Sequence, residues 1–300
     1  MGRFRISLSV EVGGNPNNPP LLLVIGLGSQ MVFWSDNFIN RLIEAGFFVI
    51  RFDNRDAGLS SKIKIPGLPR AKHLKMMLRV QAGLSNKGEP VAYNLVDMAE
   101  DTARLIKTLN LPKVNVMGAS MGGIIAQILS ARYPNRISHL ITLFSTTNRR
   151  FLPPPKPKQF VTLFKRPESH SQKDAIRHSV WFMKTVGTPG HVNVKEVREI
   201  AKIRYNRNFH PLGTLQQLNA ILATGSISKY SKLIKAPTLV LHGSKDGLVP
   251  ASSGRDVAKT IPNAKFHLID GMGHDIPDYY QPHIVQVIRE HCLGCRGTGD

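Results

Sequence analysis

The feature that most constrains this 300-residue chain is an alternation of short apolar runs with longer stretches of helical period. Strands that alternate with helices lie side by side in a mostly parallel sheet, and the helices cover both of its faces. The sequence therefore predicts an α/β fold with a mostly parallel β-sheet flanked by helices. We expect strands near residues 4–12, 21–26, 47–53, 113–117, 138–144, 237–242 and 264–269, and helices near 35–46, 94–109, 121–133, 251–260 and 281–292.

One Gly-x-Ser-x-Gly pentapeptide, Gly118 to Gly122, lies between a strand-like run and a helix-like stretch. A serine hydroxyl is a poor nucleophile at neutral pH, so an enzyme that uses one holds it exposed beside a base and beside donors for the developing oxyanion. A sharp strand-to-helix turn provides this exposure, and its crowded backbone requires small residues two positions before and after the serine. The pattern predicts Ser120 as a nucleophile; the alternative is a flexible glycine-rich loop.

A serine nucleophile of this kind needs a histidine as its general base, and the chain has 11 histidines. His274 differs from most of them because it follows a strand-like run, 265–269, and a glycine-rich loop that lets the imidazole turn inward. We therefore predict His274 as the base. His242 is the second candidate, although at the end of an apolar strand it also fits a buried histidine bonded to the backbone.

The acid that orients the histidine is expected in a loop at the carboxyl end of a strand, where open α/β sheets gather their functional groups. Asp246 follows the buried strand 237–242 and comes before His274, so we predict that it holds the imidazole in the correct tautomer. The alternative is a turn-forming Asp before Gly247. Asp270 and Asp275 are too close to His274 in sequence to face its inner nitrogen easily.

Backbone N–H groups are expected to stabilise the oxyanion, one from the residue after the nucleophile and one from the loop after an early strand. Met121 supplies the first of these donors. Leu27 is predicted to supply the second, because it lies between Gly26 and Gly28 at the end of the run 21–25. The alternative is a tight turn with no catalytic part.

These segments together resemble the α/β-hydrolase superfamily and, within it, the aclacinomycin methylesterase-like carboxylesterases. The resemblance implies a triad of Ser120, Asp246 and His274, oxyanion donors at Leu27 and Met121, and hydrolysis of a carboxylic ester through an acyl-enzyme. One departure is Ile25-Gly26, where many relatives have His-Gly. The segments that carry the resemblance are 21–28, 51–60, 94–109, 118–122, 243–250 and 271–274.

Other reactions remain open on the same fold. Carbon–carbon bond hydrolases and cofactor-free haloperoxidases or perhydrolases resemble this chain and use the same triad, so they are the alternative function. Haloalkane dehalogenases and epoxide hydrolases place an aspartate where this chain has Ser120, which speaks against both. A basic binding protein on a hydrolase fold, without catalysis, is a more distant alternative.

Two stretches interrupt the alternation, at residues 148–235 and 62–90. The first lies where relatives of the superfamily insert a cap, so we expect a hydrolase core made of residues 1–147 and 236–300 and a helical cap made of residues 148–235. The second stretch is a candidate second flap. In the cap, Trp181 and Phe182 are candidate substrate-binding residues, with Met183 beside them; at helical spacing, such a cluster also fits the cap's own core.

Positive charge is concentrated in these two stretches. Residues 148–235 hold 17 Lys and Arg against 4 Asp and Glu, a net charge of +13 out of +20 for the chain. Such a balance favours contact with an anionic partner or a solvated basic surface. No specific nucleic-acid signature is present. Residues 70–84 fit a basic amphipathic helix, which is expected to cover the sheet edge; the alternative is contact with a membrane surface.

The remaining expectations concern cofactors, partners and location. The sequence has no dinucleotide fingerprint and no metal-ligating cluster, so we predict no cofactor and no metal, and a small-molecule ester as the partner. Cys292 and Cys295 form a Cys-x-x-Cys pair that lacks further zinc ligands. No run is long and apolar enough for a transmembrane segment, and a cytoplasmic location is the default expectation.

Overall fold

The computed structural model describes residues 5–65, 68–86 and 88–294 and contains one seven-stranded sheet. Its strand order is β1-β3-β2-β4-β5-β6-β7, and only the edge strand β1 is antiparallel to its neighbour. The predicted α/β fold with a mostly parallel sheet is confirmed. The strands are β1 (Val10–Gly13), β2 (Pro20–Val24), β3 (Phe48–Phe52), β4 (Val114–Ala119), β5 (Ile137–Leu143), β6 (Thr238–Gly243) and β7 (Lys265–Ile269).

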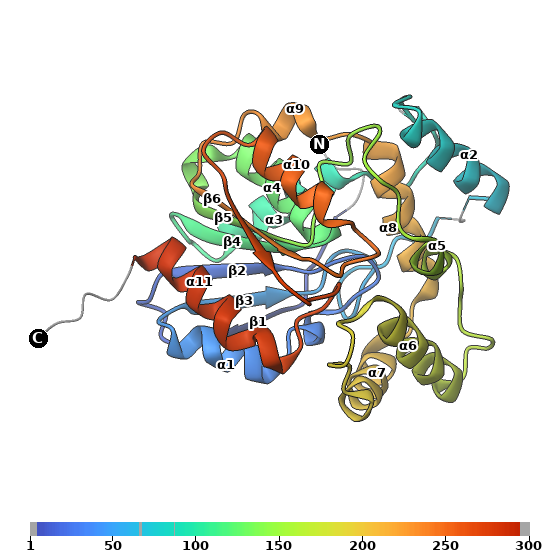
Figure 1. Ribbon diagram of the computed structural model, residues 1–300, viewed down its shortest axis with the longest axis horizontal. Coiled ribbons are helices and arrows are strands. Elements are labelled where there is room, and N and C mark those ends of the chain that lie inside the picture. The colour runs from blue at the N-terminus through green and yellow to red at the C-terminus, as the bar shows by residue number, and fades with distance from the viewer. Residues whose placement is uncertain (1–4, 66–67, 87, 295–300) are drawn as a thin grey trace, which may run out of the picture.

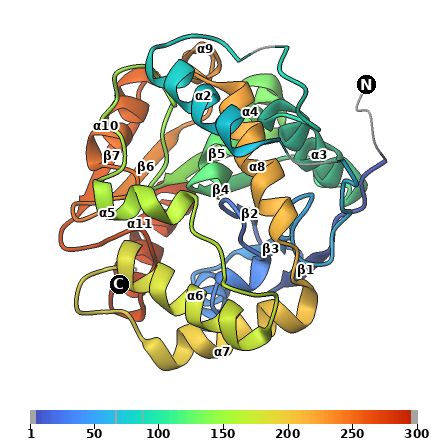
Figure 2. The same cartoon turned by 90° about the vertical axis from the view of Figure 1, so that its right-hand side faces the viewer.

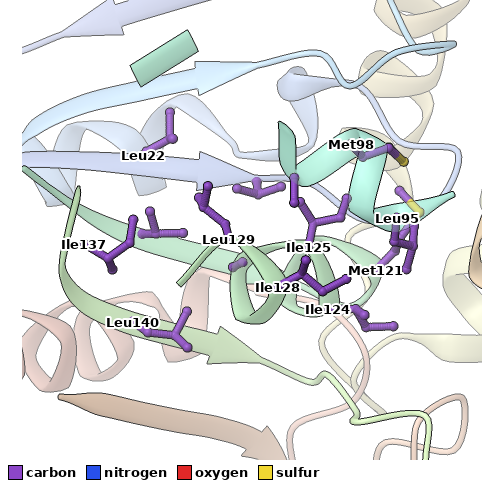
Figure 3. Close-up of a cluster of buried hydrophobic side chains, with 14 of the residues drawn as sticks. Leu22, Leu95, Met98, Met121, Ile124, Ile125, Ile128, Leu129, Ile137 and Leu140 are labelled. Atoms are coloured by element: carbon purple, nitrogen blue, oxygen red, sulfur yellow. The ribbon is translucent and has the colours of Figure 1, made fainter. Parts of the chain in front are cut away.

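Helices cover both faces of the sheet, as Figure 1 shows. Along β2 the side chains alternate: Leu22 and Val24 join one core, and Leu21 and Leu23 join the other. Figure 3 shows the first core, in which the apolar side of the helix after β4 packs on the sheet. The covering helices are α3 (Leu95–Thr108), α4 (Met121–Arg132) and α10 (Ala251–Thr260) on one face, and α1 (Asp36–Glu44) and α11 (Gln281–Leu293) on the other.

The expected first strand, 4–12, is shorter in the structure and begins at Val10. Its partner β3 ends at Phe52, so the residues before Val10 lie beside the loop that follows β3 instead. There the N–H groups of Ser7 and Ser9 donate to the hydroxyls of Ser61 and Ser60, at 2.9 and 2.8 Å. These side-chain bonds replace part of a strand ladder.

Residues 148–235, here called the inserted segment, are mainly helical. Most of the segment lies beyond the carboxyl ends of the strands, together with α2 (Arg70–Gln81) (Figures 1 and 2), whereas its last helix, α9 (Ser228–Ser231), packs against α4. The edge of the sheet at which the parallel strands end therefore faces α2 and most of the inserted segment. The segment's other helices are α5 (Pro157–Phe160), α6 (Gln172–Val186), α7 (Val194–Asn208) and α8 (Pro211–Thr224), and 3-10 turns occur at Met31–Phe33, Pro134–Arg136, Val161–Leu163 and Asp278–Tyr280.

None of the helices in the described ranges is both long and apolar enough to cross a membrane.

Candidate active site

Ser120 lies at a strained turn between β4 and α4, with φ 54° and ψ −119°. Its N–H donates to the Leu143 carbonyl at 2.9 Å, and Ser145 Oγ donates to the Ser120 carbonyl at 2.8 Å. No larger residue fits at either flanking glycine. A Cβ on Gly118 would lie 2.3 Å from the Gly122 carbonyl oxygen, and one on Gly122 only 2.1 Å from the Val24 carbonyl oxygen. The turn thus holds Ser120 in an unfavourable backbone conformation, which the packing around it enforces.

Asp246 and His274 lie at the ends of neighbouring strands and bond to each other, with 2.7 Å between Asp246 Oδ2 and His274 Nδ1. The other oxygen, Oδ1, accepts the N–H groups of Leu248 and Val249, each at 2.9 Å. Burial alone would raise the pKa of Asp246, but the charge and hydrogen bond of His274, with help from His242, lower it to about 2. The carboxylate is therefore ionised, and His274 donates to it from Nδ1, which leaves Nε2 free to accept a proton.

Ser120 and His274 line the same cavity. The His274 ring packs against Phe144, with 4.4 Å between the ring centres, so its plane is held from one side. His242, the second candidate for the base, is fully buried; its Nε2 bonds the Val249 carbonyl at 2.8 Å and lies 3.5 Å from Asp246 Oδ2. This histidine supports the acid-bearing loop and does not line the cavity.

The loop with Leu27 lies against Ser120, because a Cβ on Gly26 would be 3.3 Å from the Ser120 Cβ. Neither the Leu27 N–H nor the Met121 N–H bonds to another residue that the structure describes. Two unpaired N–H groups beside a serine hydroxyl have the composition of an oxyanion hole. The arrangement suits an oxygen that gains negative charge during attack on a carbonyl.

Asn54 and Asp53, which follow β3, bond to the loop that contains Leu27. Asn54 Nδ2 donates to the Ile25 carbonyl at 2.9 Å, and Asp53 Oδ1 accepts the Met31 N–H at 2.7 Å. The segment 51–60, quoted for its resemblance, therefore braces the backbone on both sides of Leu27.

Two side chains of the inserted segment hold Gly28, directly after Leu27. Gln217 Oε1 on α8 accepts the Gly28 N–H, and Arg204 Nη2 on α7 donates to the Gly28 carbonyl, both at 2.8 Å. Neither contact was predicted from the sequence, because the partners are 176 to 189 residues away along the chain.

The loop with His274 is held by the inserted segment as well. The His274 N–H donates to the Val186 carbonyl and the Gly273 N–H donates to Thr188 Oγ1, each at 2.9 Å. Thr188 in turn donates its N–H and its hydroxyl to Asp275 Oδ1, a carboxyl whose pKa is raised by burial. Asp275 is therefore bonded to the inserted segment and not to His274. No sequence motif points to Thr188.

The cavity has a volume of about 660 Å³ and a mainly apolar wall. Phe182 and Met183 of α6 belong to that wall, but Trp181 does not. Trp181 lies one position earlier on the helix, about 100° around its axis, and its ring packs against Lys165, with Nζ 4.3 Å from the ring centre. The structure therefore excludes Trp181 from the cavity lining.

Cys292 is a free thiol whose pKa burial raises to about 12, so it is neutral. Cys295 lies outside the described residues. Within the described part of the chain, His, Cys, Asp and Glu form no group of three or more that could hold a metal ion.

Comparison with known proteins identifies relatives of the whole chain. A model of the alpha/beta hydrolase fold family matches residues 19–279. The chain is 31% identical over 265 residues to a poly(3-hydroxyalkanoate) depolymerase from Ectopseudomonas oleovorans, covering 87% of this chain and 80% of that protein. It is 24% identical over 296 residues to rhodomycin D methylesterase DnrP from Streptomyces peucetius, covering 91% of this chain and 90% of that protein. The predicted resemblance to methylesterases is thereby confirmed.

Solved structures share the fold. The esterase EaEST from Exiguobacterium antarcticum superposes with a TM-score of 0.72 at 20% identity, over 96% of this chain and 98% of that one.

Proposed function

Since the chain belongs to the alpha/beta hydrolase fold family, as the match over residues 19–279 establishes, we propose that it is a serine hydrolase that cleaves carboxylic esters through an acyl-enzyme. The observation that carries the proposal is the bond between an ionised Asp246 and His274, whose ring lines the same cavity as Ser120. Leu27 and Met121, whose N–H groups would stabilise the oxyanion in this proposal, line that cavity too.

In the first half of the proposed reaction, Ser120 Oγ forms a bond to the ester carbonyl carbon while His274 Nε2 takes the serine proton. The carbonyl oxygen becomes an oxyanion and accepts the N–H groups of Leu27 and Met121. The imidazolium that forms is stabilised by Asp246, which stays ionised. His274 then gives its proton to the alcohol oxygen as the carbon–oxygen bond breaks, and the acyl group remains on Ser120.

In the second half, a water molecule replaces the alcohol. His274 Nε2 removes a proton from this water, whose oxygen attacks the acyl carbon, and the proton then passes to Ser120 Oγ as the acyl–serine bond breaks. The mainly apolar wall with Phe182 and Met183 favours an ester with a sizeable apolar part.

A fluorophosphonate probe tests this proposal, because it reacts only with an activated serine. Tryptic cleavage after Lys113 and Arg132 releases the peptide 114–132, which contains Ser120 and also Ser130. We expect the mass adduct on Ser120, while Ser130, whose buried Oγ donates to the Ala126 carbonyl, stays unlabelled. No adduct on the folded protein, or an adduct on another residue alone, contradicts the proposal.

A substrate panel separates esters from the alternative reaction. Acyl esters of increasing chain length are compared with a ring-fission product whose carbon–carbon bond would be cleaved. Turnover of the esters supports the proposed function. Turnover of the ring-fission product alone, on a protein that the probe still labels at Ser120, would assign the same residues to carbon–carbon hydrolysis.

Replacing Thr188 with valine is expected to lower kcat for a p-nitrophenyl ester by about 10- to 100-fold, with a smaller change in KM. The substitution leaves the Gly273 N–H without its acceptor beside His274. Steady-state kinetics measure the effect. Thr188→Ser keeps the hydroxyl and should recover most of the activity.

The matched control is Thr185→Val, three residues earlier, where the hydroxyl donates within α6 to the Trp181 carbonyl at 2.8 Å. Both variants lose one buried hydroxyl, but only Thr188 bonds to the His274 loop. Equal losses of kcat in the two variants, or no rescue by serine, would show that Thr188 does not position His274.

A further inference from the structure

Helix α2 presents apolar side chains on two opposite sides. Met76 and His73 are buried, and Met76 packs with Leu218 and Leu222 of α8, which attaches α2 to the inserted segment. Leu74 and Leu78, one turn apart on another side, are 52% and 63% exposed. A helix that needed only to cover its neighbour would place polar residues at these two positions.

The exposed apolar residues continue beyond the helix. Leu84 is 55% and Phe151 75% exposed. A Cβ on Gly83 would lie 2.5 Å from Arg150 Cδ, and the Arg150 guanidinium lies 5.2 Å from the centre of the Phe151 ring, so Phe151 adjoins the end of α2. Leu74, Leu78, Leu84 and Phe151 are called the α2 face below.

The α2 face lies at the edge of the candidate active-site cavity. Leu74 and Leu78 line this cavity although more than half of each side chain is exposed, so they border its opening. Leu152, which follows Phe151, lines it too. Whatever covers the α2 face therefore also lies beside the entrance for the substrate.

The charge around the α2 face is positive. Lys75, next to Leu74, and Arg150, next to Phe151, are exposed, and neither has an acidic partner at salt-bridge distance among the described residues. Arg79, next to Leu78, instead donates to the Ser85 carbonyl and to Asn86 Oδ1. Residues 62–90 contain seven Lys and Arg and a single acid, Glu89, which pairs with Lys72 at 2.8 Å. A partner for this surface should combine negative charge with an apolar layer.

We propose that the α2 face docks on an anionic lipid surface. Its leucines and Phe151 enter the boundary between headgroups and acyl chains, and Lys75 and Arg150 meet the headgroup phosphates. Nucleic acid would pair its phosphates with the cations but leave the leucines in water. An anionic lipid surface would pair with the cations and also bury the leucines. The docking itself does not depend on the esterase proposal; the consequence that a lipophilic ester enters the cavity directly from the lipid rests on it.

Vesicle co-sedimentation tests the docking on the full chain carrying Ser120→Ala, so that no lipid is hydrolysed. We expect binding to phosphatidylglycerol vesicles that weakens with added salt, and little binding to phosphatidylcholine vesicles. The double variants Leu74→Ser/Leu78→Ser and Lys75→Glu/Arg150→Glu should each bind about tenfold more weakly or worse. Circular dichroism and thermal unfolding show whether each variant is folded.

Matched controls come from α7, which lies far from α2 in both views (Figures 1 and 2). Arg198→Glu/Lys202→Glu reverses an exposed i,i+4 pair, and Ile203→Ser changes a side chain that is 48% exposed. Both should bind vesicles like the parent. The proposal is wrong if folded variants of the α2 face bind as well as the controls, or if binding to duplex DNA depends on Lys75 and Arg150 while vesicles are not bound.

Discussion

Hydrolysis of p-nitrophenyl acyl esters is expected to fall by about 10⁴- to 10⁶-fold when Ser120 is replaced with alanine. The substitution removes the oxygen that would carry the acyl group, and alanine offers no nucleophile in its place. Alanine meets the same strain at φ 54° as serine, so the free energy of unfolding should change little. Steady-state kinetics and thermal unfolding measure the two effects.

Ser130→Ala is the matched control, because Ser130 lies on α4, the helix that follows Ser120, and its buried hydroxyl only donates to the Ala126 carbonyl. This variant should keep its activity. Turnover by Ser120→Ala at a rate near that of the parent would mean that a different group attacks the ester, and the proposed mechanism would have to be abandoned.

Replacing Asp246 with asparagine is expected to lower kcat by about 10⁴-fold. Asparagine Oδ1 would keep the N–H groups of Leu248 and Val249, so the amide NH₂ would point at His274 Nδ1. His274 Nδ1 would then accept a hydrogen bond from this amide, so the proton of the neutral imidazole would lie on Nε2. His274 could no longer take a proton from Ser120. The measurement is kcat at the pH optimum of the parent protein.

Asp270→Asn serves as the control, since Asp270 is exposed and bonds Ser244 on the loop after β6 without contacting His274. It should leave kcat nearly unchanged. If Asp246→Asn retains most of the parent's kcat, Asp246 does not set the tautomer of His274.

The same carboxylate should make stability depend on pH. Its pKa is about 2 in the folded chain against an ordinary value of 3.8, so its contribution is fully present above pH 4 and is lost as the pH falls towards 2. The loss is on the order of 2 kcal/mol. Urea unfolding at several pH values between 2 and 6 measures the free energy of unfolding. This free energy should fall between pH 4 and 2 in the parent by the amount that the carboxylate contributes, and Asp246→Asn should lack that part of the fall.

The sequence predicts those parts of the fold and site that depend on local patterns. Parallel strands end at one edge of a sheet, so the order of Ser120, Asp246 and His274 after three such strands is enough to expect them together. Gly118 and Gly122 could be assigned from the steric demands of the turn, and the contacts found at both positions agree.

The parts that could not be predicted depend on contacts between distant segments. Thr188, Arg204 and Gln217 are ordinary polar residues of helices or their ends, and only the folded chain shows that they hold the His274 and Leu27 loops. Trp181 and Phe182 differ by one position, and which of them faces the cavity depends on how α6 is rotated about its own axis. A sequence pattern contains no information on that rotation.

The bonds from the inserted segment to Gly28 and Gly273 have a consequence for engineering and for divergence within the family. Exchanging this segment for that of a relative would remove the acceptor of the Gly273 N–H and both partners of Gly28 in one step. A chimaera whose new segment lacks equivalent groups would then have a new pocket but loosened loops around Leu27 and His274. Substrate preference should therefore be redesigned by point changes at wall positions such as Phe182 and Met183, with Thr188, Arg204 and Gln217 retained.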